Sequence, residues 1–266
     1  MSPKAWNGAF EIPCPGRSTK PRQDGLTMVI DKGLGGHLLK DLLLTAGDYI
    51  DIIKLTFGTS AFYDRDVLKK KNEIITAAGT DVMPGGTFLE VSVWQHTTAA
   101  YLERARLLGF TAIEVSDGTI EMDRTTRRDV IRRARDLGFK VITEVGKKDP
   151  AETPPMEAIH ELIREDLGNG AFKVIIEARE AGRGVGIFDQ DGKTRAGEID
   201  RILEGGFAVD NLIWEAPLKN QQQDLILQFG LNVNLGNIPP EEVLALEALR
   251  QGLRGDTLKR AYRAVR

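Results

Sequence analysis

The sequence predicts an α/β protein folded as a (β/α)8 barrel, the TIM-barrel architecture. One rhythm runs through the chain, in which a short β-branched run is followed by a polar turn and then by an amphipathic helical segment. Strands that alternate with helices form a parallel sheet, and about eight such units in one chain favour a closed barrel. Polar residues also end most of the expected strands, as they do at the functional face of this fold.

The expected strands are short runs rich in Val and Ile, bounded by polar or glycine residues. They lie near Leu26–Asp31, Tyr49–Leu55, Asp81–Pro84, Ala112–Ser116, Lys140–Val145, Lys173–Ala178, Asn211–Ala216 and Leu231–Leu235. Helix-like stretches between them include Ala99–Leu108, Thr125–Leu137, Pro155–Leu167, Ala196–Glu204, Gln222–Phe229 and Pro240–Arg250. Several helices are followed by a glycine where a left-handed residue is expected, at Gly109, Gly138, Gly168 and Gly205.

The chain is expected to form one domain over residues 1–266, and 41% of its residues are hydrophobic, enough for a large core. No linker-like or low-complexity stretch divides it. Residues 1–25 are punctuated by Pro and Gly and are expected to form an N-terminal arm.

An open, dinucleotide-binding sheet is the alternative fold. Its glycine fingerprint is best matched by DKGLGGHLL, where Gly33 and Gly35 fit but Leu38 occupies the third glycine position. The second strand ends in Lys54, where that fold needs a ribose-binding acid. Both departures favour the barrel.

Charge and cysteine content narrow the partners and the compartment. The 36 basic and 39 acidic residues give a net charge of −3 without a basic stripe, so no nucleic-acid partner is expected. Cys14 is the single cysteine, which rules out an intramolecular disulfide and fits a cytoplasmic setting. Neither a signal peptide nor a run of about 18 apolar residues is present, so no membrane contact is expected. We expect a homo-oligomer of unspecified order.

Side chains alternate along a strand, so residues two apart share a face. With each polar terminal residue taken as inward, the expected barrel-facing sets are Thr27, Val29, Asp31; Ile50, Ile52, Lys54; Ala112, Glu114, Ser116; Lys140, Ile142, Glu144; Lys173, Ile175, Glu177; Asn211, Ile213, Glu215; and Asn232, Asn234. One glutamate at a strand end is more often a solvated turn residue. Five acids in register with a lysine indicate a shared active site at the carboxyl ends of the strands.

Converging carboxylates need counter-charge, because like charges a few ångströms apart raise one another's pKa values. The three histidines are scattered and no cysteine cluster exists, so the oxygen-rich set favours magnesium over zinc. Bases also follow the strands: Lys54, Lys147, Lys148, Arg179 and Lys219.

The last loops suggest an anion site. In NVNLGNIPPEE, Gly236 and Asn237 precede a helix expected to begin at Pro239 or Pro240, and free N–H groups at such a helix start bind phosphate. The loops after the seventh and eighth strands commonly bind phosphate in this fold. The alternative is that Asn237 merely caps the helix.

Several motifs in one order carry a family resemblance: KPRQDGLTMVIDKGLG, DYIDIIKLTFGTS, PGGTFLE, GFTAIEVSDGTIEM, ITEVGKKD, IIEARE, IWEAPLKNQQ, and NVNLGNI with LALEALRQGLRGDT. With these motifs the chain resembles the phosphosulfolactate synthase family over nearly its whole length. The resemblance implies a TIM-barrel lyase that adds sulfite to phosphoenolpyruvate with magnesium, giving (2R)-phospho-3-sulfolactate, the first step of one coenzyme M route.

That chemistry implies roles for the expected site. A proton donor must serve the carbon that bears the phosphate, and Lys147 is our first choice, with Lys148 next. The magnesium ligands are expected among Asp31, Glu114, Glu144 and Glu177. The expected substrate-binding residues are Arg22, Lys54, Arg179, Lys219, Asn234, Gly236, Asn237 and Arg254.

Two other functions stay open at this point. One is a related TIM-barrel enzyme of enolate or phosphoenolpyruvate chemistry that uses another acceptor. The other is a non-catalytic barrel scaffold, which would predict decay of the mouth, whereas the acids named above are all present.

Overall fold

The computed structural model describes residues 4–178 and 181–264. Their eight strands form one sheet, and each neighbouring pair with a ladder is parallel. The strands are β1 (Thr27–Asp31), β2 (Ile52–Leu55), β3 (Asp81–Pro84), β4 (Ala112–Val115), β5 (Lys140–Val145), β6 (Lys173–Ile176), β7 (Leu212–Glu215) and β8 (Leu235–Ile238). Their order is β3-β2-β1-β8-β7-β6-β5-β4, which is the order of a barrel cut between β3 and β4.

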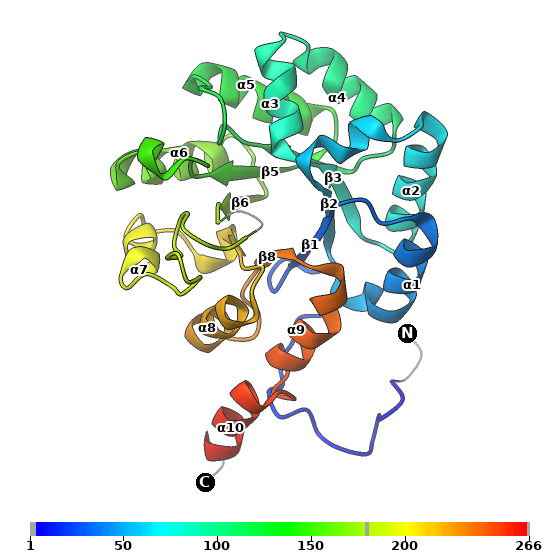
Figure 1. Cartoon of the computed structure of the whole chain (residues 1–266), viewed down its shortest axis with the longest axis vertical. Coiled ribbons are helices and arrows are strands. Elements are labelled where there is room, and N and C mark those ends of the chain that lie inside the picture. The colour runs from blue at the N-terminus through cyan, green and yellow to red at the C-terminus, as the bar shows by residue number, and fades with distance from the viewer. Residues whose placement is uncertain (1–3, 179–180, 265–266) are drawn as a thin grey trace.

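Helices surround the strands in chain order, as Figure 1 shows. They are α1 (Gly36–Ala46), α2 (Arg65–Ala77), α3 (Gly86–Trp94), α4 (Thr98–Leu107), α5 (Arg124–Asp136), α6 (Met156–Gly168), α7 (Glu198–Leu203), α8 (Lys219–Phe229), α9 (Val243–Arg250) and α10 (Gly255–Ala264). Short 3-10 segments are η1 (Gly47–Tyr49), η2 (Thr56–Phe62), η3 (Pro150–Glu152), η4 (Val209–Asn211) and η5 (Pro240–Glu242). The predicted (β/α)8 barrel is confirmed.

The barrel closes weakly between β3 and β4. No ladder pairs these two strands within the described residues, and the backbone link is one hydrogen bond from Thr111 N–H to the Val82 carbonyl, 3.1 Å long. The Thr111 hydroxyl supplements it, accepting from Val82 N–H at 3.0 Å and donating to Asp81 at 2.9 Å. Side chains therefore complete the closure that backbone pairing leaves unfinished.

Two apolar layers lie on the two faces of the sheet. The interior of the barrel holds Leu26, Met28, Ile52, Met83, Ala112, Ile142, Ile175 and Ile213, while a larger core lies between the sheet and the helices. The interior set confirms the predicted inward face of β2, β4, β5, β6 and β7, because it contains the apolar residue two positions before each terminal charge.

The predicted inward face of the first strand is wrong. Met28 packs inside the barrel, whereas Val29 belongs to the outer core, so Asp31 turns outward with Val29. All five residues of β1 are buried, and a strand covered on both faces shows no polar alternation from which its inward face could be predicted.

The last strand lies further along the chain than predicted. The expected strand was Leu231–Leu235, and β8 spans Leu235–Ile238. Gly236 faces the barrel interior, because a Cβ there would lie 2.7 Å from Met28 Cε and 3.1 Å from Ile213 Cγ2. A side chain at this position would collide with the core, so the strand needs glycine.

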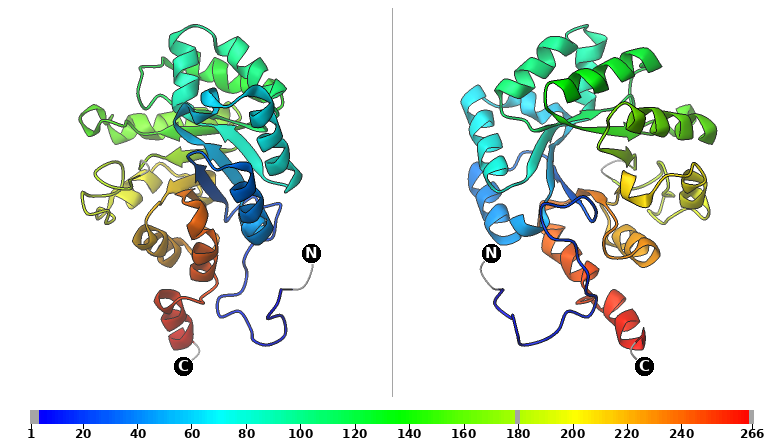
Figure 2. Two further views of the ribbon diagram at one scale, coloured as in Figure 1. Left: turned by 45° about the vertical axis from the view of Figure 1, so that its right-hand side comes forward. Right: turned by 180° about the vertical axis from the view of Figure 1, so that it is seen from behind.

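The N-terminal arm lies against the amino-terminal end of the barrel. Arg17 pairs with Glu247 of α9 at 3.1 Å, and the Cys14 N–H donates to the Gln251 carbonyl at 3.1 Å. Figures 1 and 2 show the first part of the arm as a loop extending beyond the helices, on the same side as α10. Polar residues at this end of the fold serve stability.

Two of the four predicted helix-closing glycines are confirmed. Gly109 and Gly138 have φ values of 81° and 89°, as the left-handed residue after α4 and α5 requires. The predictions for Gly168 and Gly205 are wrong: Gly168 is the last residue of α6, α7 ends at Leu203, and the left-handed residues after these helices are Gly170 and Gly206. None of the helices in the described ranges is long and apolar enough to cross a membrane.

Candidate active site

A cavity of about 210 Å³ opens at the carboxyl ends of the strands. Strand tips contribute Lys54 from β2, Glu114 from β4, Glu144 from β5 and Glu215 from β7. Its other lining residues are Ile30, Thr56, Phe57, Gly85, Gly86, Thr87, Lys148, Glu177 and Asn237. The structure thus brings together most of the charged strand tips that the sequence placed on one face.

The ammonium group of Lys54 lies at the centre of these carboxylates. Its Nζ atom is 3.0 Å from Glu114 Oε2, 3.4 Å from Glu144 Oε2 and 3.4 Å from Glu215 Oε1. All four side chains are buried. The converging acids therefore share one internal cation, and that cation belongs to the chain itself.

Burial and mutual repulsion set the protonation of the cluster. Burial raises the pKa of Glu114 to about 8, although the nearby Lys54 charge opposes this. Burial, together with the charges of Glu144 and Glu215, holds the pKa of Glu177 well above its usual range. Burial would also raise the pKa of Glu144, but the ammonium groups of Lys54 and Lys148 outweigh it and lower that pKa to about 2.

Excess negative charge is the electrostatic character of the site. Burial disfavours the charged form of Lys54, yet the surrounding glutamates raise its pKa well above the usual value. Burial likewise raises the pKa of Glu215 against the opposing charge of Lys54. One lysine is held charged while several acids have raised pKa values, so the electrostatics of the site favour the binding of a further cation.

The two lysines after β5 point to different places. Lys148 lines the mouth cavity and its Nζ donates to the Thr87 hydroxyl. Lys147 Nζ instead donates to the Asp117 carbonyl and, at 3.2 Å, to the Ile120 carbonyl of the β4–α5 loop. It lines a neighbouring cavity of about 170 Å³ that Glu177 also borders.

Helix α3 begins at the edge of the mouth cavity. Gly85 is the residue before α3 and Gly86 is the first residue of the helix, and no side chain caps it. A Cβ on Gly86 would lie 2.3 Å from Ser116 Oγ and 2.8 Å from Glu114 Oε1, so glycine permits the helix start to approach the carboxylates. Free N–H groups here, beside Lys148, suit an anion.

Asn237 is the predicted substrate-binding residue of β8 that reaches the mouth. It is buried with φ of 54°, and no protein group in the described chain hydrogen-bonds its Oδ1 atom. Gly236 lies deeper, in the barrel interior. Asn234 lies at the opposite end, where its side chain accepts from Leu26 N–H and donates to the Asp210 and Leu212 carbonyls.

Asp31 is separate from the other predicted metal ligands. Its Oδ1 atom accepts from the N–H groups of Gly33 and Leu34 at 2.7 Å each, and its Oδ2 atom pairs with Lys71 of α2 at 2.7 Å. The outward face of Val29 and Asp31 explains this placement.

Three of the remaining predicted bases, all in the described part of the chain, do not line the mouth cavity. Arg22 pairs with Asp51 at 3.1 Å, at the amino-terminal end of β2. Lys219 pairs with Asp256 of α10 at 2.6 Å, and Arg254 precedes that helix. Arg179 falls outside the described residues.

A buried glutamate that the sequence did not reveal organises the loop beside the site. Glu90 of α3 accepts from Ser116 Oγ at 2.6 Å and from the N–H groups of Thr119 and Ile120 at 2.9 Å each. The loop that it holds supplies the carbonyls for Lys147, and its Gly118 carbonyl accepts from Lys148 N–H at 3.1 Å. Glu90 was missed because α3 was not among the helices expected. The signal that could have indicated its start was the Gly-Gly pair after an expected strand.

The donor set fits a divalent cation in charge and in chemistry. Among the described residues no three Asp, Glu, His or Cys side chains form a ready-made metal site. However, the described lining of the cavity holds four carboxylates against two bases, Lys54 and Lys148. A hard cation such as Mg²⁺ binds carboxylate oxygens and would replace protons on acids whose pKa values are raised, such as Glu114 and Glu177.

Comparison with known proteins shows the family to which this chain is similar. Residues 15–256 match the model of the family described as (2R)-phospho-3-sulfolactate synthase (ComA). The phosphosulfolactate synthase of Methanothermobacter thermautotrophicus is 44% identical over 252 residues, 94% of this chain and 97% of that protein. The phosphosulfolactate synthase of Methanocaldococcus jannaschii is 46% identical over 237 residues, 88% of this chain and 94% of that protein.

Among solved structures, 3-hexulose-6-phosphate synthase from Salmonella typhimurium superposes with a TM-score of 0.54. The match covers 84% of this chain and 97% of that one at 13% identity. At this level of identity the likeness concerns the fold alone.

Proposed function

The chain belongs to the (2R)-phospho-3-sulfolactate synthase family and is therefore an enzyme that forms a carbon–sulfur bond, a lyase-type activity. On that premise we propose that it adds sulfite to phosphoenolpyruvate in a magnesium-dependent reaction, giving (2R)-phospho-3-sulfolactate. The observation that carries the proposal is the cluster of Lys54 with buried glutamates and Lys148 around one cavity at the barrel mouth.

The proposed reaction forms one bond and moves one proton. The sulfur lone pair of sulfite attacks the methylene carbon of phosphoenolpyruvate, and the π electrons of the double bond shift toward the substrate carboxylate as an enolate. A proton donor then protonates the carbon that bears the phosphate, and no bond to phosphorus breaks. The chain must therefore bind anions, stabilise the enolate and hold one transferable proton.

Lys148 is the proton donor that the geometry favours, because its ammonium group lines the cavity and lies at the start of α3. Lys147, the first choice from the sequence, becomes the second candidate, and its contacts with the β4–α5 loop support a positioning role. The free N–H groups at the start of α3, with Thr87, suit the phosphate or the sulfite.

The acids have the complementary task of holding positive charge. Glu114, Glu144 and Glu177 would hold Mg²⁺, and the bound ion would supply charge stabilisation to the substrate carboxylate. Lys54 fixes the carboxylates of Glu114, Glu144 and Glu215 in one arrangement before any ligand arrives. Such preorganisation lowers the cost of stabilising the enolate. Action in the cytoplasm, and as a homo-oligomer, remains part of the proposal.

The test is product formation from defined components. Purified protein is incubated with phosphoenolpyruvate, sulfite and MgCl₂, and the mixture is analysed by mass spectrometry for a phosphorylated sulfonate. Product that requires all three components, and disappears with EDTA, supports the proposal.

Matched reactions identify which part of the proposal fails. Replacement of sulfite by another nucleophile tests the identity of the nucleophile, and turnover with that nucleophile alone would replace sulfite as the substrate. Full activity in EDTA would contradict the magnesium requirement alone. If phosphoenolpyruvate is not consumed with sulfite or with any other nucleophile, the assigned reaction is refuted.

A further inference from the structure

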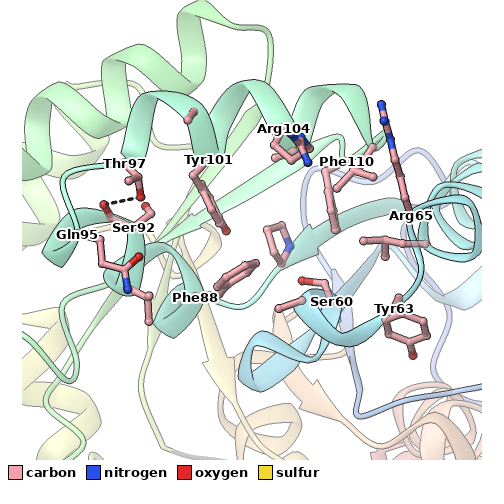
Figure 3. Close-up of a pocket in the computed structure, with 17 residues that line it drawn as sticks. Ser60, Tyr63, Arg65, Phe88, Ser92, Gln95, Thr97, Tyr101, Arg104 and Phe110 are labelled. Atoms are coloured by element: carbon pink, nitrogen blue, oxygen red, sulfur yellow. Dashed lines mark hydrogen bonds between the residues drawn. The ribbon is translucent and has the colours of Figure 1, made fainter.

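A second cavity, of about 450 Å³, lies outside the barrel between η2, α3 and α4. Its floor includes Pro84 at the end of β3 and Phe110 just before β4, so it covers the weak closure of the barrel. Figure 3 shows Tyr101 of α4 and Phe88 of α3 extending toward the same space. A cavity of this volume is in the range that binds small molecules.

The inner part of the cavity combines aromatic rings with unpartnered hydroxyl groups. Phe88 and Tyr101 pack edge to face with ring centroids 5.2 Å apart. Ser60 Oγ and Tyr101 Oη are both buried, and no group in the described chain hydrogen-bonds either atom. Buried hydroxyls without partners are costly, so two in one cavity wall indicate a place for a polar ligand atom.

Two arginines line the same cavity without an acidic partner. Neither Arg65 nor Arg104 makes a side-chain ion pair or hydrogen bond within residues 4–178 and 181–264. Arg106, on the same helix as Arg104, instead pairs with Glu103 at 3.0 Å. The two guanidinium groups are therefore available to an anion, which they bind in a planar, two-pronged geometry.

We propose that this outer cavity is a binding site for a small amphipathic anion, a carboxylate or sulfonate with an aromatic or branched apolar body, and that it serves as an effector site. The apolar body packs against Phe88, Tyr101 and Phe110, and the anionic group pairs with Arg104 and Arg65. The Ser60 and Tyr101 hydroxyls provide hydrogen bonds to a second polar atom.

An effector role follows from walls that the two cavities share. In η2, Thr56 and Phe57 line the mouth cavity, whereas Ser60 and Ala61 line the outer one. In α3, Gly86 and Thr87 line the mouth cavity, whereas the helix continues with Phe88 into the wall of the outer one. A ligand that shifts either segment changes both cavities, and the resulting coupling between two sites is reciprocal.

Binding is measured first and independently of catalysis. Isothermal titration calorimetry with 3-phenylpropionate is expected to show one saturable site, while 3-phenylpropan-1-ol, its uncharged counterpart, binds more weakly. Arg104→Gln is expected to weaken 3-phenylpropionate binding by about tenfold or more. Ala100→Trp, which adds an indole at an exposed lining position, is expected to abolish it, and Arg106→Gln serves as the matched control without effect.

The effector role is measured second, as the change in kcat or KM for phosphoenolpyruvate at saturating 3-phenylpropionate. This step rests on the proposed function, but the calorimetry does not, so failure of either is distinguishable. Absence of saturable binding, or binding unchanged in both variants, would overturn the site. Binding without any change in kcat or KM would overturn the effector role. Sedimentation velocity covers the rival occupant: a wild-type oligomer that dissociates in Ala100→Trp would make the cavity an interface between copies and refute the proposal.

Discussion

The ammonium group of Lys54 on β2 lies 3.0 Å from Glu114 Oε2 on β4, across the mouth of the barrel. Both side chains are buried, and Glu144 and Glu215 also lie within 3.4 Å of the same ammonium. Removal of this cation leaves the buried acids with Lys148 as their remaining compensating base among the described residues that line the cavity.

Lys54→Met is expected to lower the free energy of unfolding by about 3–5 kcal/mol, because the substitution removes one partner of a buried ion-pair cluster. Urea denaturation followed by circular dichroism measures the change. Lys70→Met is the control, since Lys70 pairs with Glu73 on the surface of α2. Glu114→Gln added to Lys54→Met is expected to restore part of the loss. Equal stability of Lys54→Met and Lys70→Met would show that the Lys54 ammonium does not stabilise the buried glutamates.

The stability of the metal-free protein is expected to fall as pH rises. The pKa of Glu114 is about 8 in the folded protein and 4.5 in an ordinary glutamate, so between these values the folded state binds more protons than the unfolded state. The free energy of unfolding then decreases with pH across that window. Glu144 has the opposite sign, and its contribution is lost only as pH falls from 4.5 toward about 2.

Urea titrations in EDTA at a series of pH values measure this slope. Glu114→Gln is expected to flatten it, since the amide cannot ionise. A slope that is unchanged in Glu114→Gln would assign the bound proton to another member of the cluster.

Magnesium binding is expected to release protons. The cation would replace protons held by Glu114 and Glu177, whose pKa values are raised by burial first and then by neighbouring acids. Calorimetric titration of MgCl₂ in two buffers of different ionisation enthalpy measures the release, and the melting temperature is expected to rise with Mg²⁺. Glu177→Gln is expected to weaken both effects. Asp31→Asn is expected to leave both effects unchanged, because Asp31 contacts Lys71 and lies away from the cluster.

The lysines after β5 are expected to differ in kinetics. Lys148→Met is expected to lower kcat by about 10²–10⁴-fold, the range for loss of a positioned proton donor. Lys147→Met is expected to have a smaller effect on kcat, because its ammonium group holds loop carbonyls outside the mouth cavity. Steady-state assays of both variants decide this, and a larger loss in Lys147→Met would exchange the two roles.

Glu90→Ala is expected to loosen the β4–α5 loop. It leaves Ser116 Oγ and the N–H groups of Thr119 and Ile120 without their acceptor. The buried Ser116 hydroxyl alone is expected to cost about 1–3 kcal/mol when left unpaired. Hydrogen exchange of the Thr119 and Ile120 amides is expected to quicken relative to Glu103→Ala, a surface change on α4. Unchanged exchange in Glu90→Ala would show that Glu90 does not hold the β4–α5 loop in place.

Alternation made much of the site predictable from the sequence. In β4, β5, β6 and β7 a buried apolar residue and a terminal glutamate stand two apart, so the inward face follows from spacing. The same reasoning failed at β1, where apolar residues occupy both faces and nothing in Thr27–Asp31 distinguishes them. The same reasoning placed Asn234 at the carboxyl end of the last strand, whereas it lies before the amino-terminal end of β8. The alternation in NVNLGNI fits the expected strand Leu231–Leu235 as well as it fits the observed one.

Contacts between distant segments were not predictable in this way. The Lys71 partner of Asp31 and the Glu90 clamp join elements whose packing angle no local pattern encodes. Likewise, Lys147 and Lys148 are adjacent and chemically alike, and only the fold of the β4–α5 loop separates their surroundings.

The gap between β3 and β4 makes these two strands the edges of the sheet, although they are consecutive in the sequence. One backbone hydrogen bond, at Thr111, spans this gap, so the eight strands form an open sheet whose two edge strands lie next to each other. A circular permutant with new termini between α4 and β4 would cut the chain where the ring is already interrupted, and would leave each parallel ladder intact. We therefore expect a cut at Gly109 to cost less stability than a cut at a turn between laddered strands.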